Sequence, residues 1–234
     1  MGISSFLTQV SIVVIMAVMN NVLVIYGAGS KYGADIPMTV VGIVMKVFQI
    51  VISVVVGIAA GAQPIVGYNY GAGLWRRVKL IFRTMMAAEF SVGLVSLICF
   101  EVFPVQIISV FGSEDGLYNE FAVLAFRVFL GGIVLCCIQK SCSIFLQSMG
   151  KPALSMLLSL LRDFVLSVPL TLVLPRLFGV TGALYSGPAA DVISFGAAVL
   201  CMAAVFRKLN RLEDGEVALY GASQGGLAVE RKIC

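Results

Sequence analysis

The sequence lacks histidine altogether, and this absence narrows the possible functions. Without histidine the chain has neither the commonest general base nor the commonest metal ligand of proteins. The spacing of its cysteines matches no zinc site, and the sequence has no phosphate-binding loop, nucleophile motif or paired-carboxylate signature. The sequence therefore predicts a protein that is not an enzyme and that holds no metal and no organic cofactor.

Charged residues are scarce as well. They make up 12% of the chain, while apolar residues make up 60%, against roughly a quarter and a half in soluble domains. Apolar stretches of about 20 residues recur, and each is long enough to cross a hydrocarbon layer about 30 Å thick. These stretches lack the period-2 alternation of barrel strands. Because a lipid bilayer leaves backbone groups no other partners, the sequence predicts an all-α polytopic membrane protein.

Six spans are expected, separated by breaks rich in Gly, Pro and Ser. Together they form one transmembrane bundle over residues 1–211, followed by a Gly-rich tail over 212–234 that we expect to be loose and cytoplasmic. The first span has no basic leading segment and is too long for a signal peptide, so it counts as a membrane helix. The expected helices cover about 1–26, 36–63, 82–111, 120–148, 153–174 and 182–206.

Basic residues are distributed unequally over the two sides of these spans. Eight lie on the side of the termini and two on the other side. Since basic loops stay in the cytoplasm, we expect a multi-pass membrane protein with both termini inside. The same anchoring role accounts for the net charge of +4, so no nucleic-acid partner is expected. The eight are Arg76, Arg77, Lys79, Arg83, Lys151, Arg207, Lys208 and Arg211, and the two are Lys31 and Arg176.

Four charged residues are predicted near the middle of the bilayer: Lys46, Arg162, Asp163 and Asp191. Each lies nine or ten residues into its span, which is roughly 15 Å deep. A charge at that depth costs at least about 2.5 to 3.5 kcal/mol, so we expect these side chains to face a polar interior, with Asp191 paired to Lys46 or Arg162. Arg162 and Asp163 point about 100° apart on a helix and are expected to meet different partners. The alternative is a buried ion pair that fixes helix packing without touching substrate.

Other features of the spans carry weaker signals. Pro188 precedes Asp191 by three residues and frees a backbone carbonyl one turn earlier. A broken helix beside a midplane carboxylate is typical of cation sites in secondary transporters, although a tolerated kink produces the same pattern. The remaining charges within the spans are expected to be interfacial or snorkelling. They are Glu89, Glu101, Arg127 and Lys140.

The most specific pattern is GAQPIVGYNYGAG at residues 61–73, followed by LWRRVK. We expect Pro64 and the glycines to end the second helix there, with the aromatic and basic residues at the cytoplasmic membrane surface. The segment resembles the loop signature of the multidrug and toxic compound extrusion (MATE) family, in particular its MepA-like bacterial branch. The motif residues are Gln63, Pro64, Gly67, Tyr68, Asn69, Tyr70, Gly71 and Arg77.

The resemblance continues through the membrane region, at Asn20-Asn21 and at residues 147–152, 159–163, 177–183 and 188–191. It implies one six-helix lobe, the carboxy-terminal half, of a twelve-helix transporter in the plasma (inner) membrane of a bacterium. The resemblance further implies antiport of cationic or amphipathic small molecules against sodium ions or protons, with the coupling ion in place of a cofactor. The other bundle, where several members place the coupling carboxylates, is absent.

Several alternatives remain open at this point. The chain is a fragment or incomplete gene model (the reading that we favour, because the first span starts at Met1 without a cytoplasmic lead), or it pairs with a separate amino-terminal half or with a second copy of itself. A flippase for lipid-linked precursors within the same superfamily would need a wide basic cavity, which Lys46, Arg127, Lys140 and Arg162 could supply. The last alternative is an inactive bundle or scaffold with purely structural charges.

Overall fold

The computed structural model describes residues 2–111 and 116–230, in which helices follow one another with short connections and no strand. Six segments of this described part are long and apolar enough to cross a membrane. The expectation of an all-α bundle with six spans is therefore confirmed. The spans are Gln9–Ala28, Asp35–Gly71, Trp75–Val102, Gly116–Ser148, Pro152–Phe178 and Val180–Gly215.

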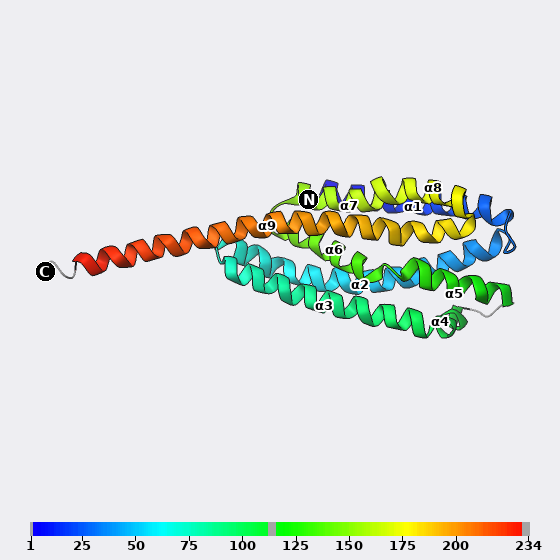
Figure 1. The fold of residues 1–234 in the computed structure, drawn as a ribbon, viewed down its shortest axis with the longest axis horizontal. Coiled ribbons are helices and arrows are strands. Elements are labelled where there is room, and N and C mark those ends of the chain that lie inside the picture. The colour runs from blue at the N-terminus through cyan, green and yellow to red at the C-terminus, as the bar shows by residue number, and fades with distance from the viewer. Residues whose placement is uncertain (1, 112–115, 231–234) are drawn as a thin grey trace.

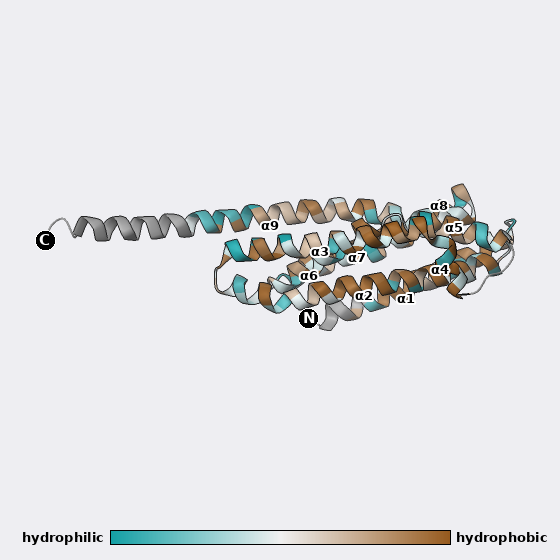
Figure 2. Ribbon diagram, turned by 90° about the horizontal axis from the view of Figure 1, so that it is seen from below, coloured by the Kyte–Doolittle hydropathy of each residue, from teal (hydrophilic) through white to brown (hydrophobic). Residues whose placement is uncertain are grey.

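The helices lie side by side in one elongated bundle (Figure 1). Figure 2 shows apolar residues along most of the bundle and hydrophilic residues gathered toward its ends, as a lipid-facing surface requires. In chain order the elements are α1 (Gly2–Ala28), α2 (Asp35–Gly71), α3 (Trp75–Val102), α4 (Pro104–Phe111), α5 (Gly116–Leu130), α6 (Ile133–Ser148), α7 (Pro152–Leu160), the π-helix η1 (Leu161–Leu166), α8 (Ser167–Phe178) and α9 (Val180–Glu230).

Two apolar clusters fill the interior, and a polar layer separates them. The first cluster includes Leu23 and Phe126, and the second includes Phe145 and Leu209. On α3 and α9 the buried polar residues fall between the part of the helix in one cluster and the part in the other, and on α6 Gln139 and Ser141 do the same. The apolar clusters thus hold the polar layer at mid-depth of the bundle. Its buried members include Glu89, Gln139, Ser141, Asp163, Asp191 and Ser194.

The expectation that Pro64 ends the second helix is wrong. Pro64 lies inside α2, so most of the 61–73 motif is helical rather than a loop. Proline removes one backbone hydrogen bond, a loss that membrane helices tolerate when neighbouring groups compensate. The helix ends instead at Gly71. Gly73 follows in the turn with a φ of +75°, which favours glycine, and the Leu74 N–H donates to the Asn69 carbonyl at 2.9 Å.

Three of the other expected helices are interrupted. The third breaks at Phe103, because Pro104 has no N–H to continue the α-helical ladder and begins α4 instead. The fourth breaks at the pair Gly131-Gly132 and therefore consists of α5 and α6. The fifth changes to a π-helix over 161–166. The expected loop at 112–115 lies outside the described residues.

The expected loose tail also differs from the structure. Helix α9 continues to Glu230, and Figure 1 shows it extending beyond the other helices. The first turns of this extension contact α3, because Lys79 Nζ donates to Asn210 Oδ1 at 2.8 Å and forms an ion pair with Glu213. The apolar pattern stops near residue 206, but a helix satisfies its own backbone hydrogen bonds and does not need that pattern to continue. Residues 231–234 lie outside the described part.

Candidate functional site: a cavity with an ion-pair cluster

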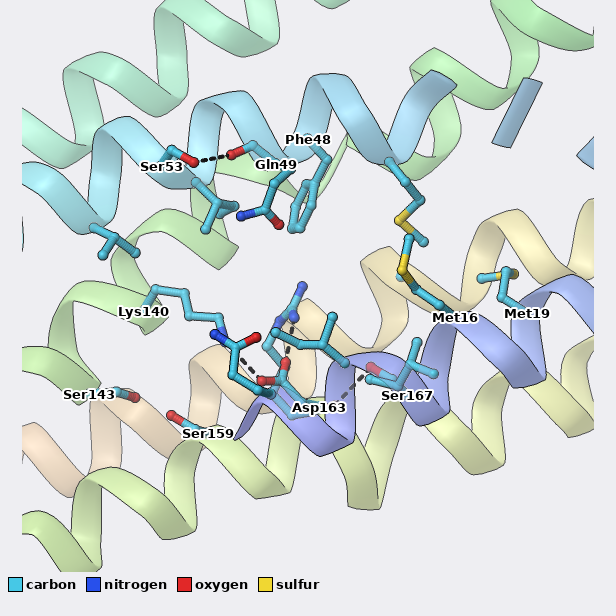
Figure 3. Close-up of a pocket in the computed structure, with 18 of the residues that line it drawn as sticks. Met16, Met19, Phe48, Gln49, Ser53, Lys140, Ser143, Ser159, Asp163 and Ser167 are labelled. Carbon is cyan, nitrogen blue, oxygen red and sulfur yellow. Dashed lines mark hydrogen bonds and ion pairs between the residues drawn. The ribbon is translucent and has the colours of Figure 1, made fainter. Parts of the chain in front are cut away.

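A cavity of about 1030 Å³ lies between α1, α2 and the span formed by α7, η1 and α8, with contributions from α6 and α9. Figure 3 shows its two kinds of wall. Met16 and Met19 line it from α1, while Phe48, Gln49 and Ser53 line it from α2. The cavity therefore has an apolar side and a polar side, which suits an amphipathic molecule.

Four charged side chains meet at the wall of this cavity, and we call them the ion-pair cluster: Lys140, Arg162, Asp163 and Asp191. Arg162 Nε donates to Asp191 Oδ1 at 2.8 Å, and Arg162 Nη1 donates to Asp163 Oδ1 at 2.7 Å. Lys140 Nζ donates to Asp163 Oδ2 at 2.9 Å (Figure 3). Two cations and two carboxylates sum to zero when all four are ionised.

The ion-pair cluster is buried as well as balanced. Asp163 and Asp191 are each 2% exposed, and the side chains of Arg162 and Lys140 are 12% and 15% exposed. Buried charges need good geometry and satisfied hydrogen bonds to offset their lost hydration. The short contacts supply that compensation, so the removal of any one member leaves an uncompensated charge.

The π-helix contains two members of the ion-pair cluster, the donor Arg162 and the acceptor Asp163. A π turn holds more residues than an α turn and is frequent at functional sites. Here the Ser167 hydroxyl donates to the Arg162 carbonyl, five residues earlier, at 2.8 Å. The expectation that Arg162 and Asp163 meet different partners is wrong in part, because the long guanidinium side chain reaches its neighbour in this wider turn. Asp163 also meets Lys140.

A glycine makes room for Asp191, the second carboxylate of the ion-pair cluster. A Cβ atom on Gly132 would lie 2.7 Å from Asp191 Oδ2 and 3.2 Å from the Cα atom of Pro188. The break between α5 and α6 therefore lets α9 approach closely, with the Asp191 carboxylate over the glycine. Of the two partners predicted for Asp191, the structure has Arg162.

Lys46, the other predicted partner, lines the cavity but forms no ion pair with a described residue. Lys140, expected to be interfacial, is instead a member of the ion-pair cluster. It lies eight residues before the end of α6, roughly 12 Å from that end. The expected span 120–148 ends at the same residue as α6. The depth of Lys140 therefore follows from the sequence, which lacked only the direction in which the side chain points.

Glu89 was expected to be interfacial too, and this expectation is wrong. It is fully buried (0% exposed) on α3, where the two carboxyl oxygens have no hydrogen bond with a described residue. Ser141 of α6 lies close to it. Glu101 and Arg127 instead form a half-exposed pair, with Arg127 Nε 3.4 Å from Glu101 Oε2.

The motif residues lie at the α2–α3 end of the bundle, and none of them lines the cavity. Their contacts are structural: a Cβ on Gly67 would lie 3.4 Å from the Ser148 carbonyl, and the rings of Tyr70 and Trp75 meet at 5.4 Å. Asn69 is buried and donates from Nδ2 to the Ile65 carbonyl at 2.7 Å. Among the described residues no group of three acidic or cysteine side chains could hold a metal ion.

Fold and cavity together define a polytopic helical membrane protein with paired charges at mid-depth and a cavity along one side. The chain belongs to the MatE family, whose family model matches residues 5–173.

Curated relatives and solved structures agree with this assignment. The Multidrug export protein MepA of Staphylococcus aureus (strain NCTC 8325 / PS 47) is 23% identical over 202 residues, which are 85% of this chain and 42% of that protein. An outward-facing structure of a multidrug resistance MATE family transporter of the MOP superfamily has a TM-score of 0.80 at 18% identity, over 90% of this chain and 46% of that one. An inward-facing structure of a multidrug resistance MATE family transporter of the MOP superfamily has a TM-score of 0.78 at 18% identity, over 90% of this chain and 47% of that one. The chain thus spans less than half the length of these relatives.

Proposed function

We propose that the chain is one lobe of an efflux transporter that moves amphipathic organic compounds across a bacterial inner membrane in exchange for sodium ions or protons. The observation that carries the proposal is the ion-pair cluster beside the cavity of about 1030 Å³. Buried charges at membrane depth are expensive and typically serve substrate or ion pathways. The relatives named as multidrug export protein and multidrug resistance transporter support the same substrate class.

The ion-pair cluster offers a route to ion coupling. A sodium ion or proton that binds Asp163 or Asp191 competes with Arg162 or Lys140 for the same carboxylate oxygens. Binding of the coupling ion therefore releases a basic side chain and changes the charge of the cavity wall. A ligand shifts a conformational equilibrium only through such differential interactions, so this exchange of partners is the proposed coupling step.

A single six-helix bundle needs a facing surface to enclose a polar pathway. The relatives are more than twice as long as the aligned part of this chain. We propose that the facing surface is a second six-helix bundle, either an amino-terminal half or another copy of this chain.

Basic residues support a cytoplasmic position for one end of the lobe. The α2–α3 turn, the α6–α7 connection and the stretch of α9 after residue 206 lie at the same end (Figure 1). Arg76, Lys151 and Lys208 are among the basic residues there, and burial together with the nearby Lys208 charge lowers the pKa of Lys151. The positive-inside rule places this end, with both termini, in the cytoplasm.

Dye efflux from cells tests the proposal. The full chain is expressed alone or with the amino-terminal bundle of a MepA-type relative, and cells are loaded with a cationic or an anionic fluorescent dye of equal size. We expect efflux of at least one dye that depends on an imposed sodium or proton gradient. Asp191→Asn should abolish it, because this change removes a carboxylate that the coupling ion would bind.

Asp35→Asn is the matched control, since Asp35 is exposed at the start of α2 and does not line the cavity. It should leave efflux unchanged. Efflux only with the added bundle would identify the chain as one lobe of a pair. A chain that inserts well and gives no gradient-dependent efflux in either arm would refute the proposal and favour a scaffold role.

A further inference from the structure

The charges that line the cavity are unequal in number. Four ionisable side chains line it, three of them basic and one acidic. Asp191 does not line the cavity itself, but it forms an ion pair with Arg162. Counted with this wall, it brings the number of carboxylates to two. When all five groups are ionised, three positive and two negative charges leave this wall with one net positive charge.

Both carboxylates are already engaged. Asp163 accepts from Arg162 with one oxygen and from Lys140 with the other, at 2.7 and 2.9 Å. Asp191 accepts from Arg162 at 2.8 Å with Oδ1, and its Oδ2 lies against Gly132, where even a Cβ atom would be 2.7 Å away. A cationic ligand therefore finds no free carboxylate on this lobe and would have to displace Arg162 or Lys140 from one.

Lys46 differs from these paired side chains, because it has no partner among the described residues. It is exposed on α2, lines the cavity, and has neither an ion pair nor a hydrogen bond with a described residue. Gln49 and Ser53 follow at spacings of three and seven residues and line the same cavity, so the three lie along one face of the helix. They form a polar strip with one cationic group, the Gln49 amide as a hydrogen-bond donor, and the Ser53 hydroxyl, which donates to the Gln49 carbonyl at 2.7 Å and can accept from a ligand.

The helix that carries the strip also reaches the ion-pair cluster. The Phe48 ring on α2 has the Arg162 guanidinium 5.9 Å from its centroid, so α2 reaches the cluster at this level. Apolar side chains of α1 and α2 also line the cavity, and Figure 3 shows Met16 and Met19 among them. They include Ile12, Ile15, Met16, Met19, Ile52 and Val56.

We infer that this cavity selects amphipathic compounds with an acidic group (a carboxylate, sulfonate or phosphate), which binds Lys46 while the apolar body lies against α1. The inference rests on the proposed function in one respect, that this cavity is the substrate path. An acid at Lys46 is attracted by the net positive charge of the wall and leaves the ion-pair cluster intact. A cation is repelled by the same charge and gains a partner only at the cost of a buried ion pair.

Equilibrium binding tests the inference independently of transport. The full chain, purified in a non-ionic detergent, is titrated with two fluorescent naphthalene probes of equal size, one with a sulfonate and one with a trimethylammonium group. We expect the Kd of the sulfonate probe to be at least tenfold lower. Lys46→Gln should raise that Kd about tenfold, and Lys46→Arg should keep it within about threefold because the charge remains.

Lys208→Gln is the matched control, because Lys208 is an exposed lysine of α9 that does not line the cavity. It should leave both Kd values unchanged, and unchanged circular dichroism and elution volume would show that each variant is folded. Tighter binding of the ammonium probe overturns the inference. So does the absence of saturable sulfonate binding, or a Kd that Lys46→Gln does not change.

The acidic ligand could be a free small molecule or a lipid-linked phosphate. Competition of an aryl phosphate and of a long-chain alkyl phosphate against the sulfonate probe separates the two sources, and displacement by either one supports the inference. Saturable sulfonate binding in a chain that fails the efflux test would contradict the proposed transport and not the acid site. Efflux of only the cationic dye would overturn the acid site and leave transport standing.

Discussion

Two buried acidic regions lie at mid-depth of the bundle and differ in what surrounds them. The carboxylates of the ion-pair cluster border a cavity and have basic partners at 2.7 to 2.9 Å. Glu89 lies between α3 and α6, where packing is close: a Cβ on Gly93, one turn away, would be 3.1 Å from the Cα atom of Val134. No described residue gives its carboxyl group a hydrogen bond.

The comparison shows which surroundings in this lobe can accommodate a charged side chain. Beside the cavity, two cations and two carboxylates compensate each other and remain available to ions that enter. Inside the α3–α6 contact a lone carboxylate would cost far more than a neutral acid. We therefore expect Glu89 to behave as a neutral side chain and the ion-pair cluster to behave as a set of charges, and four measurements can break or sharpen this contrast.

The largest effect is expected for Arg162→Met. This change removes the one group that binds both Asp163 and Asp191 and leaves two buried carboxylates with only Lys140. The free energy of unfolding should fall by about 3 to 5 kcal/mol, as for other broken buried pairs. Reversible unfolding in mixed micelles measures it, and a loss below about 1 kcal/mol would contradict a cluster held by charge.

The two aspartates of the cluster should differ from each other. Asp163→Asn should cost about 3 kcal/mol and Asp191→Asn about 2 kcal/mol, because Asp163 has two basic partners and Asp191 has one. The same unfolding assay ranks them. Equal losses would mean that Lys140 contributes nothing to the stability of the cluster.

Glu89→Gln should have a much smaller effect, below about 1 kcal/mol, because an amide replaces a neutral acid of nearly the same shape. Its unfolding curve should match that of the wild type. A loss above about 2 kcal/mol would show that the native side chain is charged and stabilised by a partner.

The smallest effect is expected for the exposed ion pair of Lys31 and Glu120, at the end of the lobe opposite the α2–α3 turn (Figure 1). Lys31 Nζ donates to Glu120 Oε1 at 2.8 Å, and this hydrogen bond raises the pKa of Lys31 above its usual 10.5. A raised lysine pKa stabilises the fold below the unfolded value, and that contribution disappears as the pH rises through the folded value. Glu120→Gln should therefore lower the stability slightly at pH 9, and the difference should vanish above the folded-state pKa. A difference that persists there would exclude the pair as its cause.

Much of the fold could be predicted from the sequence, because long apolar runs determine which segments span a bilayer. The number of spans and the class follow from that alone. The contact between Arg162 and Asp191 was among the predicted pairs, because an acid and a base at similar depth have few other partners in lipid.

The rest depends on which face each helix turns toward its neighbours, and hydropathy along a chain does not contain that information. Glu89 was placed at the interface because its span was expected to begin near residue 82, whereas α3 begins at Trp75. Lys140 was placed there although the expected end of its span is the end of α6, because the sequence did not show which way its side chain points. Pro64 was expected to end a helix because the sequence does not show which groups satisfy the freed carbonyl. Arg162 pairs with its neighbour Asp163 within a π-helix, which no residue pattern in 161–166 indicates.

That π-helix also bears on how the fifth span changes during evolution. A π turn contains about one residue more than an α turn, as if a single residue had been inserted into a regular helix. The surplus residue is absorbed within 161–166, so α7 and α8 on either side keep their own helical phase, and Ser159 and Thr171 both line the cavity. Loss of one residue from this segment would convert it to α-helix and leave those faces in place. Loss of a residue elsewhere in the span would turn one part against the other by about 100° and carry half of the lining away from the cavity.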